Sequence, residues 1–229
     1  MSTRLRNLAA DLWVAEMPFA RMGFEMGARM TIVRLPDGQL WIHSPIELNL
    51  SLKSEVAALG EIAFIVSPYR FHFAHLAEWA HAFPSARMFS APGLTSETAR
   101  TRLDDYLDST PHAAWSDVLD QAVFRGNTLD NEVDFFHRPS RTLILADLCF
   151  NIPDHGSFST KMAARSLGVL NRLAPTRTFR VATKDPNAAR ISLRRLMEWD
   201  FERIILSHGS IVEHNGKARL REAFMWLFE

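Results

Sequence analysis

Two histidines follow a short apolar stretch of the sequence and precede a helical pattern. The stretch is 63–66, and the turn after it, Arg70-Phe71-His72-Phe73-Ala74-His75, sets His72 and His75 three residues apart. Imidazole nitrogens are common ligands of zinc and iron, and the end of a buried strand fixes the backbone that aims them. This turn is the first candidate for a metal site.

Two more polar side chains end strand-like apolar runs. Asp147 follows the run 142–146, and His208 follows the run 203–206. If the ends of these strands meet at one edge, the sequence brings a carboxylate and several imidazoles into a single cleft.

The elements that must position these groups come in two similar halves. The first sixty residues predict strands, and 63–66 predicts a central strand, because it is a continuous apolar run. Further strands are expected at 118–124, 132–137, 142–146 and 203–206, with a short one at 179–182. Helices are expected at 50–59, 76–83, 94–107, 162–173 and 218–228, and Asp185-Pro186 predicts a helix start by its cap and first-turn proline. The order β-rich, α, β-rich, α predicts one domain over residues 1–229, in which two mixed sheets carry helices on the outside.

The composition excludes several classes of partner. Of 229 residues, 47% are hydrophobic and 23% charged, and 26 Lys and Arg balance 26 Asp and Glu. A neutral chain has no global electrostatic case for nucleic acid or an anionic membrane, so we expect a small-molecule substrate. Cys149 is the single cysteine, which fits a reducing compartment and predicts a thiol in the core. The N-terminal sequence lacks a long apolar segment, so we expect a cytoplasmic protein.

These residues and their order resemble the metallo-β-lactamase-like hydrolase superfamily, specifically its divergent DUF4336 branch, over nearly the whole chain. The superfamily pattern is a strand ending in His-x-His-x-Asp-His, a later turn with a histidine, a strand ending in Asp and a final strand ending in His. The resemblance implies the α/β class: an αββα four-layer sandwich of two mixed β-sheets flanked by helices. It also implies one or two zinc or iron ions at the ends of the strands.

The match is partial. His72 and His75 keep two histidines of the first motif, whereas Arg70 stands in place of its first histidine and Ala74 in place of its aspartate. The second motif falls on 126–131, where Asn127 replaces the histidine. Asp147 and His208 match the bridging aspartate and the last histidine.

The losses imply one ion at most. His75, Asp147 and His208 would form one remaining site, with His72 as a fourth ligand or a hydrogen-bonding neighbour. Arg70 puts a cation where a ligand stood, which would repel a second ion. It would instead pair with Asp147 or clamp an anionic substrate.

Two functions from different classes follow. The first is a mononuclear metal-dependent hydrolase with zinc or iron, in which Arg70 orients the substrate and Asp147 manages the proton. The alternative is a metal-free, non-catalytic binding or assembly module on the same fold, which predicts an Arg70–Asp147 salt bridge. An iron oxygenase is a third reading. The sequence also leaves open whether Trp199, Phe224, Trp226 and Phe228 form core or a homodimer contact.

Three other histidines are weaker candidates. His43 ends a strand and would line the cleft or cap that strand. His155 lies in the polar loop after Asp147, within reach of the site. His137 is expected at the surface.

Overall fold

The computed structural model describes residues 5–128 and 132–229, so Leu129, Asp130 and Asn131 of the expected second motif lie outside the described residues. The first sheet has seven strands in the order β1-β2-β5-β6-β7-β8-β9. They are β1 (Leu5–Ala9), β2 (Leu12–Met17), β5 (Ala28–Arg34), β6 (Leu40–His43), β7 (Ile62–Ser67), β8 (Arg87–Ser90) and β9 (Asp105–Tyr106). Neighbours from β1 to β6 are antiparallel, and those from β6 to β9 are parallel.

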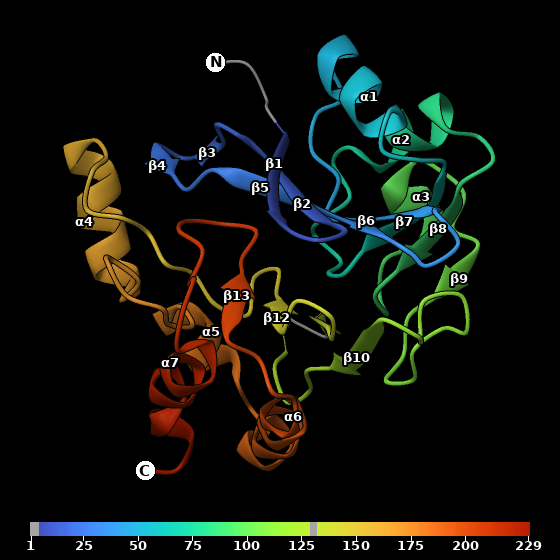
Figure 1. Cartoon of the computed structure of the whole chain (residues 1–229). Coiled ribbons are helices and arrows are strands. Elements are labelled where there is room, and N and C mark those ends of the chain that lie inside the picture. The colour runs from blue at the N-terminus through green and yellow to red at the C-terminus, as the bar shows by residue number, and fades with distance from the viewer. Residues whose placement is uncertain (1–4, 129–131) are drawn as a thin grey trace.

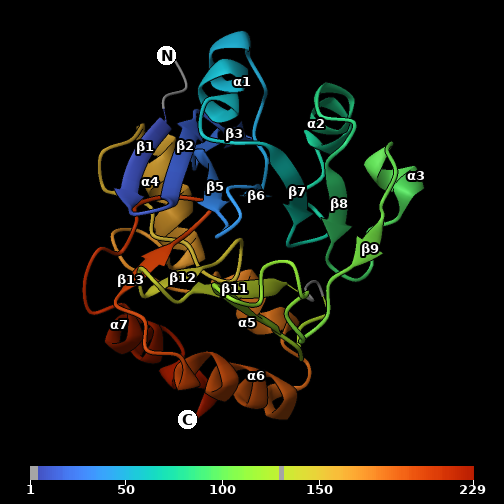
Figure 2. The same ribbon diagram turned by 45° about the vertical axis from the view of Figure 1, so that its right-hand side comes forward.

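The second sheet faces the first (Figures 1 and 2). Its four strands are β10 (Leu119–Val123), β11 (Val133–His137), β12 (Thr142–Ile144) and β13 (Arg203–Ile205), in that order. Only β12 and β13 are parallel, so both run toward the same edge of the sheet. A separate short hairpin, β3 (Ala20–Arg21) and β4 (Phe24–Glu25), extends from the first sheet.

Helices cover the outer face of each sheet. The first sheet carries α1 (Leu50–Ala57), α2 (Leu76–Ala82) and α3 (Ser96–Ala99), and the second carries α5 (Arg177–Ala182), α6 (Pro186–Glu198), α7 (Gly216–Ala223) and the 3₁₀ turn Met225–Leu227. The remaining helix, α4 (Phe158–Leu167), packs beside β4. The layers therefore follow the predicted αββα order, and Figure 2 shows the two helical layers on opposite sides of the sheets. Within the described residues, every helix is too short or too polar to cross a bilayer.

Alternation along the strands divides the apolar side chains between a central core and two outer cores. Trp41, Phe64 and Phe135 lie between the sheets, where the Trp41 and Phe135 ring centroids are 4.8 Å apart. β7 is almost wholly buried because helices cover one face and the second sheet covers the other. The rigid end of β7 therefore supports the turn that carries His72.

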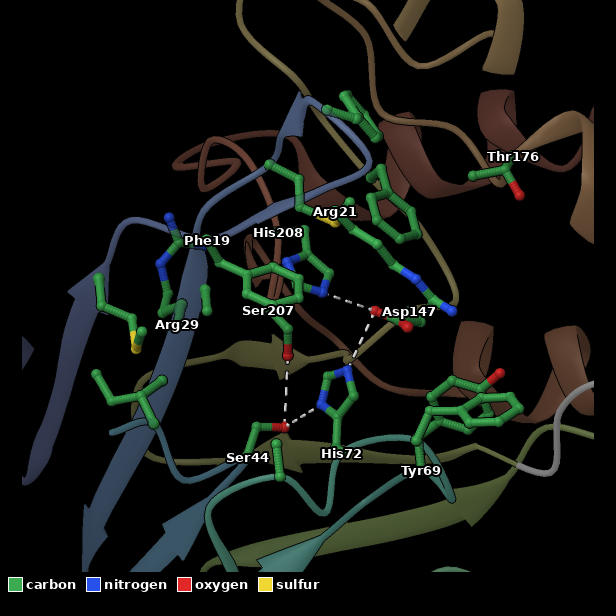
Figure 3. Close-up of a pocket in the computed structure, with 18 of the residues that line it drawn as sticks. Phe19, Arg21, Arg29, Ser44, Tyr69, His72, Asp147, Thr176, Ser207 and His208 are labelled. Carbon is green, nitrogen blue, oxygen red and sulfur yellow. Dashed lines mark hydrogen bonds and ion pairs between the residues drawn. The ribbon is translucent and has the colours of Figure 1, made fainter. Parts of the chain in front are cut away.

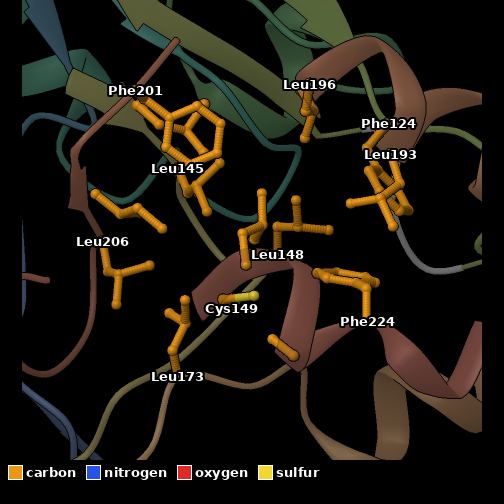
Figure 4. Packing of buried hydrophobic residues seen from close by; sticks show 14 of the residues in the cluster. Phe124, Leu145, Leu148, Cys149, Leu173, Leu193, Leu196, Phe201, Leu206 and Phe224 are labelled. Atoms are coloured by element: carbon orange, nitrogen blue, oxygen red, sulfur yellow. The ribbon is translucent and has the colours of Figure 1, made fainter. Parts of the chain in front are cut away.

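The outer core of the second sheet holds the single thiol. Cys149 has no exposed surface and packs with Leu148, Leu173 and Phe224 (Figure 4). Burial raises its pKa well above the ordinary value, so the predicted core thiol is confirmed. Trp199 and Phe224 are buried in the same cluster.

Two expected elements differ. The predicted helix 94–107 is helical only at Ser96–Ala99 and ends at Arg100, which has a φ of +53°. Beyond it, Asp104 accepts the backbone N–H of Met88 (2.7 Å) and Arg102 donates to the carbonyl of Ala86 (2.5 Å), which holds the segment against the edge of the sheet. Long-range side-chain contacts thus replace the expected helical turns.

The predicted strand at 179–182 is the helix α5. Thr176 caps it by accepting the backbone N–H of Phe179 (3.1 Å), a signal that outweighs the apolar run.

His137 was expected at the surface but is 1% exposed, because β11 is covered on both faces. Its Nδ1 lies 2.7 Å from Ser140 Oγ.

Candidate metal centre

The turn after β7 is folded back onto the end of its strand. The hydroxyl of Ser67, the last residue of β7, shares its one proton between the carbonyls of Tyr69 (3.0 Å) and His72 (2.9 Å), and the His72 N–H donates to Tyr69 O (2.9 Å). Because Ser67 is fully buried, these bonds are shielded from water. The turn therefore holds the backbone of His72 in one position.

The His72 ring is oriented by a serine at the end of β6. Its Nδ1 lies 2.9 Å from Ser44 Oγ, and Ser207 Oγ donates to Ser44 Oγ at 3.4 Å (Figure 3). Ser44 has a φ of +52°, an unusual conformation for a residue with a side chain. This backbone, followed by Pro45, points the hydroxyl at the imidazole and leaves Nε2 of His72 to face the cavity.

Asp147 is held through its backbone. The two carboxyl oxygens of buried Glu132 accept the N–H groups of Ala146 and Asp147, each at 2.6 Å. Burial, with the nearby Asp134, raises the pKa of Glu132 well above its ordinary value. The loop after β12 is thus fixed from the inside, and the Asp147 side chain projects into the cavity.

His208 is fixed by the first sheet, although it follows a strand of the second. Its Nδ1 donates to the carbonyl of Gly27 at 2.5 Å. Arg29, which is 8% exposed, donates to the carbonyls of Leu206 and Gly209 on either side of His208 and also pairs with Glu16 (2.8 Å). The turn at 206–209 is therefore clamped to β5 by contacts that span almost the whole chain.

The three side chains meet at one carboxylate oxygen. Nε2 of His72 and Nε2 of His208 lie 3.3 and 3.2 Å from Oδ1 of Asp147 (Figure 3), and the three ligand atoms lie within 4.8 Å of one another. Because Gly27 O can only accept, the Nδ1 of His208 carries a proton, and neutral His208 turns a lone pair on Nε2 toward the carboxylate. Two lone pairs at this distance need a cation between them, either a proton or a metal ion, so the donor set fits a metal.

The charges of the cluster support one another. Burial alone would raise the pKa of Asp147, but His72 and His208 outweigh burial and hold that pKa well below its ordinary value. Burial alone would lower the pKa of His208, but the Asp147 carboxylate and the Gly27 carbonyl raise it. Asp147 is therefore ionised at neutral pH and strongly favours a positive charge beside it.

A cavity of about 340 Å³ opens above the cluster. Its walls are mainly apolar and include six aromatic rings: Phe19, Phe24, Tyr69, Phe71, Phe150 and Phe179. Phe19 and Phe150 stack on the His208 ring, with centroids 5.8 and 5.3 Å away. The cluster is thus a small polar patch in an apolar chamber.

Other predicted site residues lie farther out. His75 lines the cavity from the start of α2, but its Nδ1 faces Glu78 Oε2 (3.4 Å) and it is outside the three-ligand group. The guanidinium of Arg70 lies over the Phe71 ring, 4.7 Å from its centroid, and Arg70 is not among the residues that line the cavity. Among the described residues Asp147 pairs with His72 and His208, so the Arg70–Asp147 salt bridge expected for the metal-free module is not formed.

Asn127, in the place of the turn histidine, is also turned away from the cluster. Its side chain donates to Phe179 O (2.9 Å) and Thr183 Oγ1 (3.1 Å), which ties the start of the second motif to α5. Ala74 lines the cavity and offers no ligand atom.

The remaining histidine candidates do not join the cluster. His43 is 1% exposed and stacks on Trp41, and burial lowers its pKa to about 3. His155 is exposed and lines a different hollow of the surface.

Sequence reasoning missed the residues that support the ligands: Ser44, Glu132 and Arg29. Two of them had a weak signal, since Arg29 and Glu132 are charged residues at the start of predicted strands. The hydroxyl of Ser44 had none, because its direction depends on a positive φ.

Comparison with known proteins agrees with this fold. The sequence profile of the family described as "Domain of unknown function (DUF4336)" matches residues 10–179, and no curated protein sequence matches the chain. Among solved structures, a metallo-beta-lactamase from Pontibacter korlensis superposes with a TM-score of 0.67 at 12% identity, over 100% of both chains. The FIM-1 metallo-beta-lactamase from Pseudomonas aeruginosa in its mono-zinc form gives 0.64 at 10% identity, over 99% of this chain and 93% of that one. A metal-soaked Flv1 flavodiiron core from Synechocystis gives 0.68 at 12% identity, over 99% of this chain and 61% of that one.

Proposed function

The chain belongs to the DUF4336 family and has the metallo-beta-lactamase fold, and from this premise we propose that it is a metal-dependent hydrolase with a single ion held by His72, Asp147 and His208. The fold supports the reaction class, and the three convergent side chains support the position of the ion. The ion is zinc or iron, because two imidazoles and one carboxylate suit both.

One observation carries the proposal. The Nδ1–H of His208 is taken by Gly27 O, so when His208 is neutral its Nε2 lone pair faces the Asp147 carboxylate at 3.2 Å. A cation between these atoms turns a repulsive contact into a favourable one. The mono-zinc form of the Pseudomonas aeruginosa relative lends support, since this fold accommodates a single ion there.

When bound, such an ion acidifies a coordinated water and polarises the bond to be cleaved. The chain's own groups prepare the site for it. Ser44 and Gly27 fix the ring orientations of His72 and His208, as hydrogen-bonding partners behind metal ligands do. Asp147 stays ionised at neutral pH and would accept a hydrogen bond from the attacking water. Phe19 and Phe150 shield His208 from solvent.

A non-catalytic binding module is the second candidate, and one feature favours it. Protonated His208 would satisfy the same contact with Asp147, and the raised pKa of His208 makes that state accessible without a metal. The two functions therefore differ in which cation, proton or metal, lies between His208 and Asp147.

Metal analysis of the purified protein separates them. Protein prepared without added metal, and protein reconstituted with Zn²⁺ or Fe²⁺, is expected to hold about one equivalent. Asp147→Asn should hold less than about a tenth of an equivalent, since the charged ligand is lost. Asp117→Asn is the matched control, because Asp117 is an exposed aspartate outside the cavity. Wild-type protein that stays below about a tenth of an equivalent after reconstitution would exclude the hydrolase.

A further inference from the structure

The cavity above the cluster combines an apolar lining with one charged side chain that has no ion-pair partner among the described residues. We propose that it binds a small molecule with a flat aromatic body and an anionic group: the body packs against Phe19 and Phe150, and the anion pairs with Arg21. That this molecule is the substrate rests on the proposed function, whereas its binding does not.

The volume limits the size of the ligand. About 340 Å³ lies near the lower end of the range for small-molecule pockets, which start at roughly 300 Å³. A peptide or a nucleic acid would not fit inside such a chamber. The ligand is therefore a small molecule of one or two rings.

The walls select an aromatic body. Phe19 reaches the cavity from the segment before β3, and Phe150 reaches it from the loop after Asp147, so aromatic surface comes from two separate segments. Both rings already stack on His208, and Phe19 remains 40% exposed. A flat ring continues this stacking, whereas a polar ligand such as a sugar would leave the apolar walls unfilled.

The charge comes from Arg21 in β3. Two arginines line the cavity, but Arg29 is engaged by Glu16 and by two backbone carbonyls. Arg21 is exposed, and among residues 5–128 and 132–229 no carboxylate pairs with it. Figure 3 shows its side chain extending from the hairpin toward the side of the cavity on which Asp147 lies.

The cluster does not cancel this positive charge. The carboxylate of Asp147 is faced by two imidazoles, and the cation that this cluster accommodates, a metal ion or a proton on His208, compensates its charge inside the cluster. A guanidinium that lines an apolar chamber binds a carboxylate through paired, charge-assisted hydrogen bonds. Arg70, which the sequence predicts as a clamp for an anionic substrate, does not line the cavity, whereas Arg21 does.

The test measures binding of three probes by calorimetry: 2-naphthoate, the neutral 2-naphthamide, and acetate. The full-length protein is used as purified and after chelation, and its metal content is determined for each sample. We expect naphthoate to bind about tenfold or more tightly than naphthamide, as a charge-assisted pair would give, and acetate to bind more weakly than both.

Two matched pairs of variants locate the two anchors. Arg21→Gln should abolish the preference for naphthoate over naphthamide, whereas Arg194→Gln, at an exposed arginine of α6, should keep it. Phe19→Ala should weaken both aromatic probes about tenfold, whereas Phe158→Ala, at a phenylalanine that is 78% exposed and outside the cavity, should not. Thermal melting checks that each variant is folded.

Acetate binding as tightly as naphthoate, or a naphthoate preference that survives Arg21→Gln, would overturn the inference. If protein that takes up no metal binds the three probes in the expected order, the inference stands and the hydrolase is excluded. If metal-loaded protein binds neither aromatic probe, the inference is overturned and the hydrolase stands.

Discussion

The turn after β7, at 68–75, and the turn after β13, at 206–209, both bring imidazoles to the same cavity, yet they control their side chains differently. The 206–209 turn has one histidine, which is 9% exposed and held by Gly27 O, with Arg29 clamping the backbone on either side. The 68–75 turn has two histidines and an arginine, and only His72 is directed at Asp147. His75 is 31% exposed and faces Glu78.

The difference shows what makes a histidine a ligand candidate in this fold. Position after a strand brings both His72 and His75 near the cavity. A hydrogen-bonding partner behind the ring separates them, because Ser44 orients His72 whereas the partner of His75 lies on its own helix. Pre-oriented rings lose less side-chain entropy on binding an ion.

The largest expected effect separates the two turns directly. His208→Gln should weaken metal binding by more than about 100-fold, since loss of even a supporting partner costs about 10–100-fold. His75→Gln should change the affinity by less than about threefold, because His75 lies outside the ligand group. Competition with a chromophoric chelator measures both constants.

His72→Gln is the internal control from the 68–75 turn and should resemble His208→Gln. Equal, large losses for His75→Gln and His208→Gln would instead support the ligand set implied by the family resemblance, in which the 68–75 turn rearranges around the ion.

A second prediction tests the clamp on the 206–209 turn. Arg29→Met should lower the free energy of unfolding by about 2–4 kcal/mol, because two carbonyls and Glu16 lose a buried, charged donor. Arg6→Met is the matched control, since Arg6 also pairs with Glu16 but is half exposed, and it should cost less than about 0.5 kcal/mol. Urea unfolding of chelated protein measures both.

The two variants should also differ in metal affinity. A loosened 206–209 turn would weaken binding by about tenfold in Arg29→Met, as for other supporting residues behind metal ligands, and Arg6→Met should bind as the wild type does. Equal losses of metal affinity in Arg29→Met and Arg6→Met would show that pairing with Glu16, rather than the hydrogen bonds from Arg29 to the 206–209 turn, supports the site.

Much of this site could be predicted from local sequence. Asp147 and His208 each follow an apolar run, and the end of a buried strand is a local property that periodicity reveals. The layer order was also predictable, because the alternation of strand and helix patterns leaves few arrangements that bury all apolar faces.

The direction of individual side chains was not predictable, because it depends on contacts between distant residues. Arg29 and Leu206 are 177 positions apart, and Ser44 and His72 are 28 apart. Arg70 aligns with a ligand position in the family pattern, yet its backbone turn places it over Phe71. Contacts between distant residues also explain why the helix prediction for 94–107 was wrong, since Asp104 and Arg102 are bound to the edge of the sheet instead of forming helix.

The smallest expected effect is a pH dependence that only the 206–209 turn should show. In chelated protein the folded-state pKa of His208 is raised, so its protonation contributes stability that is fully present below the unfolded value of about 6.5 and is lost as the pH rises through the folded pKa. The lowered pKa of Asp147 contributes stability that is present above about pH 4 and is lost as the pH falls through its folded pKa. Stability should therefore decline further as the pH rises above about 6.5, in addition to the decline that the raised pKa of buried Glu132 causes above about pH 4.5, measured as the urea midpoint between roughly pH 5 and 9. Asp147→Asn should flatten the decline, and His75→Gln should preserve it, because His75 has no part in the pair.

In metal-loaded protein the sign should reverse, since a proton on His208 competes with the ion and rising pH strengthens binding. A decline that persists unchanged in Asp147→Asn would place its origin outside the His208–Asp147 pair and remove the distinction between the two turns.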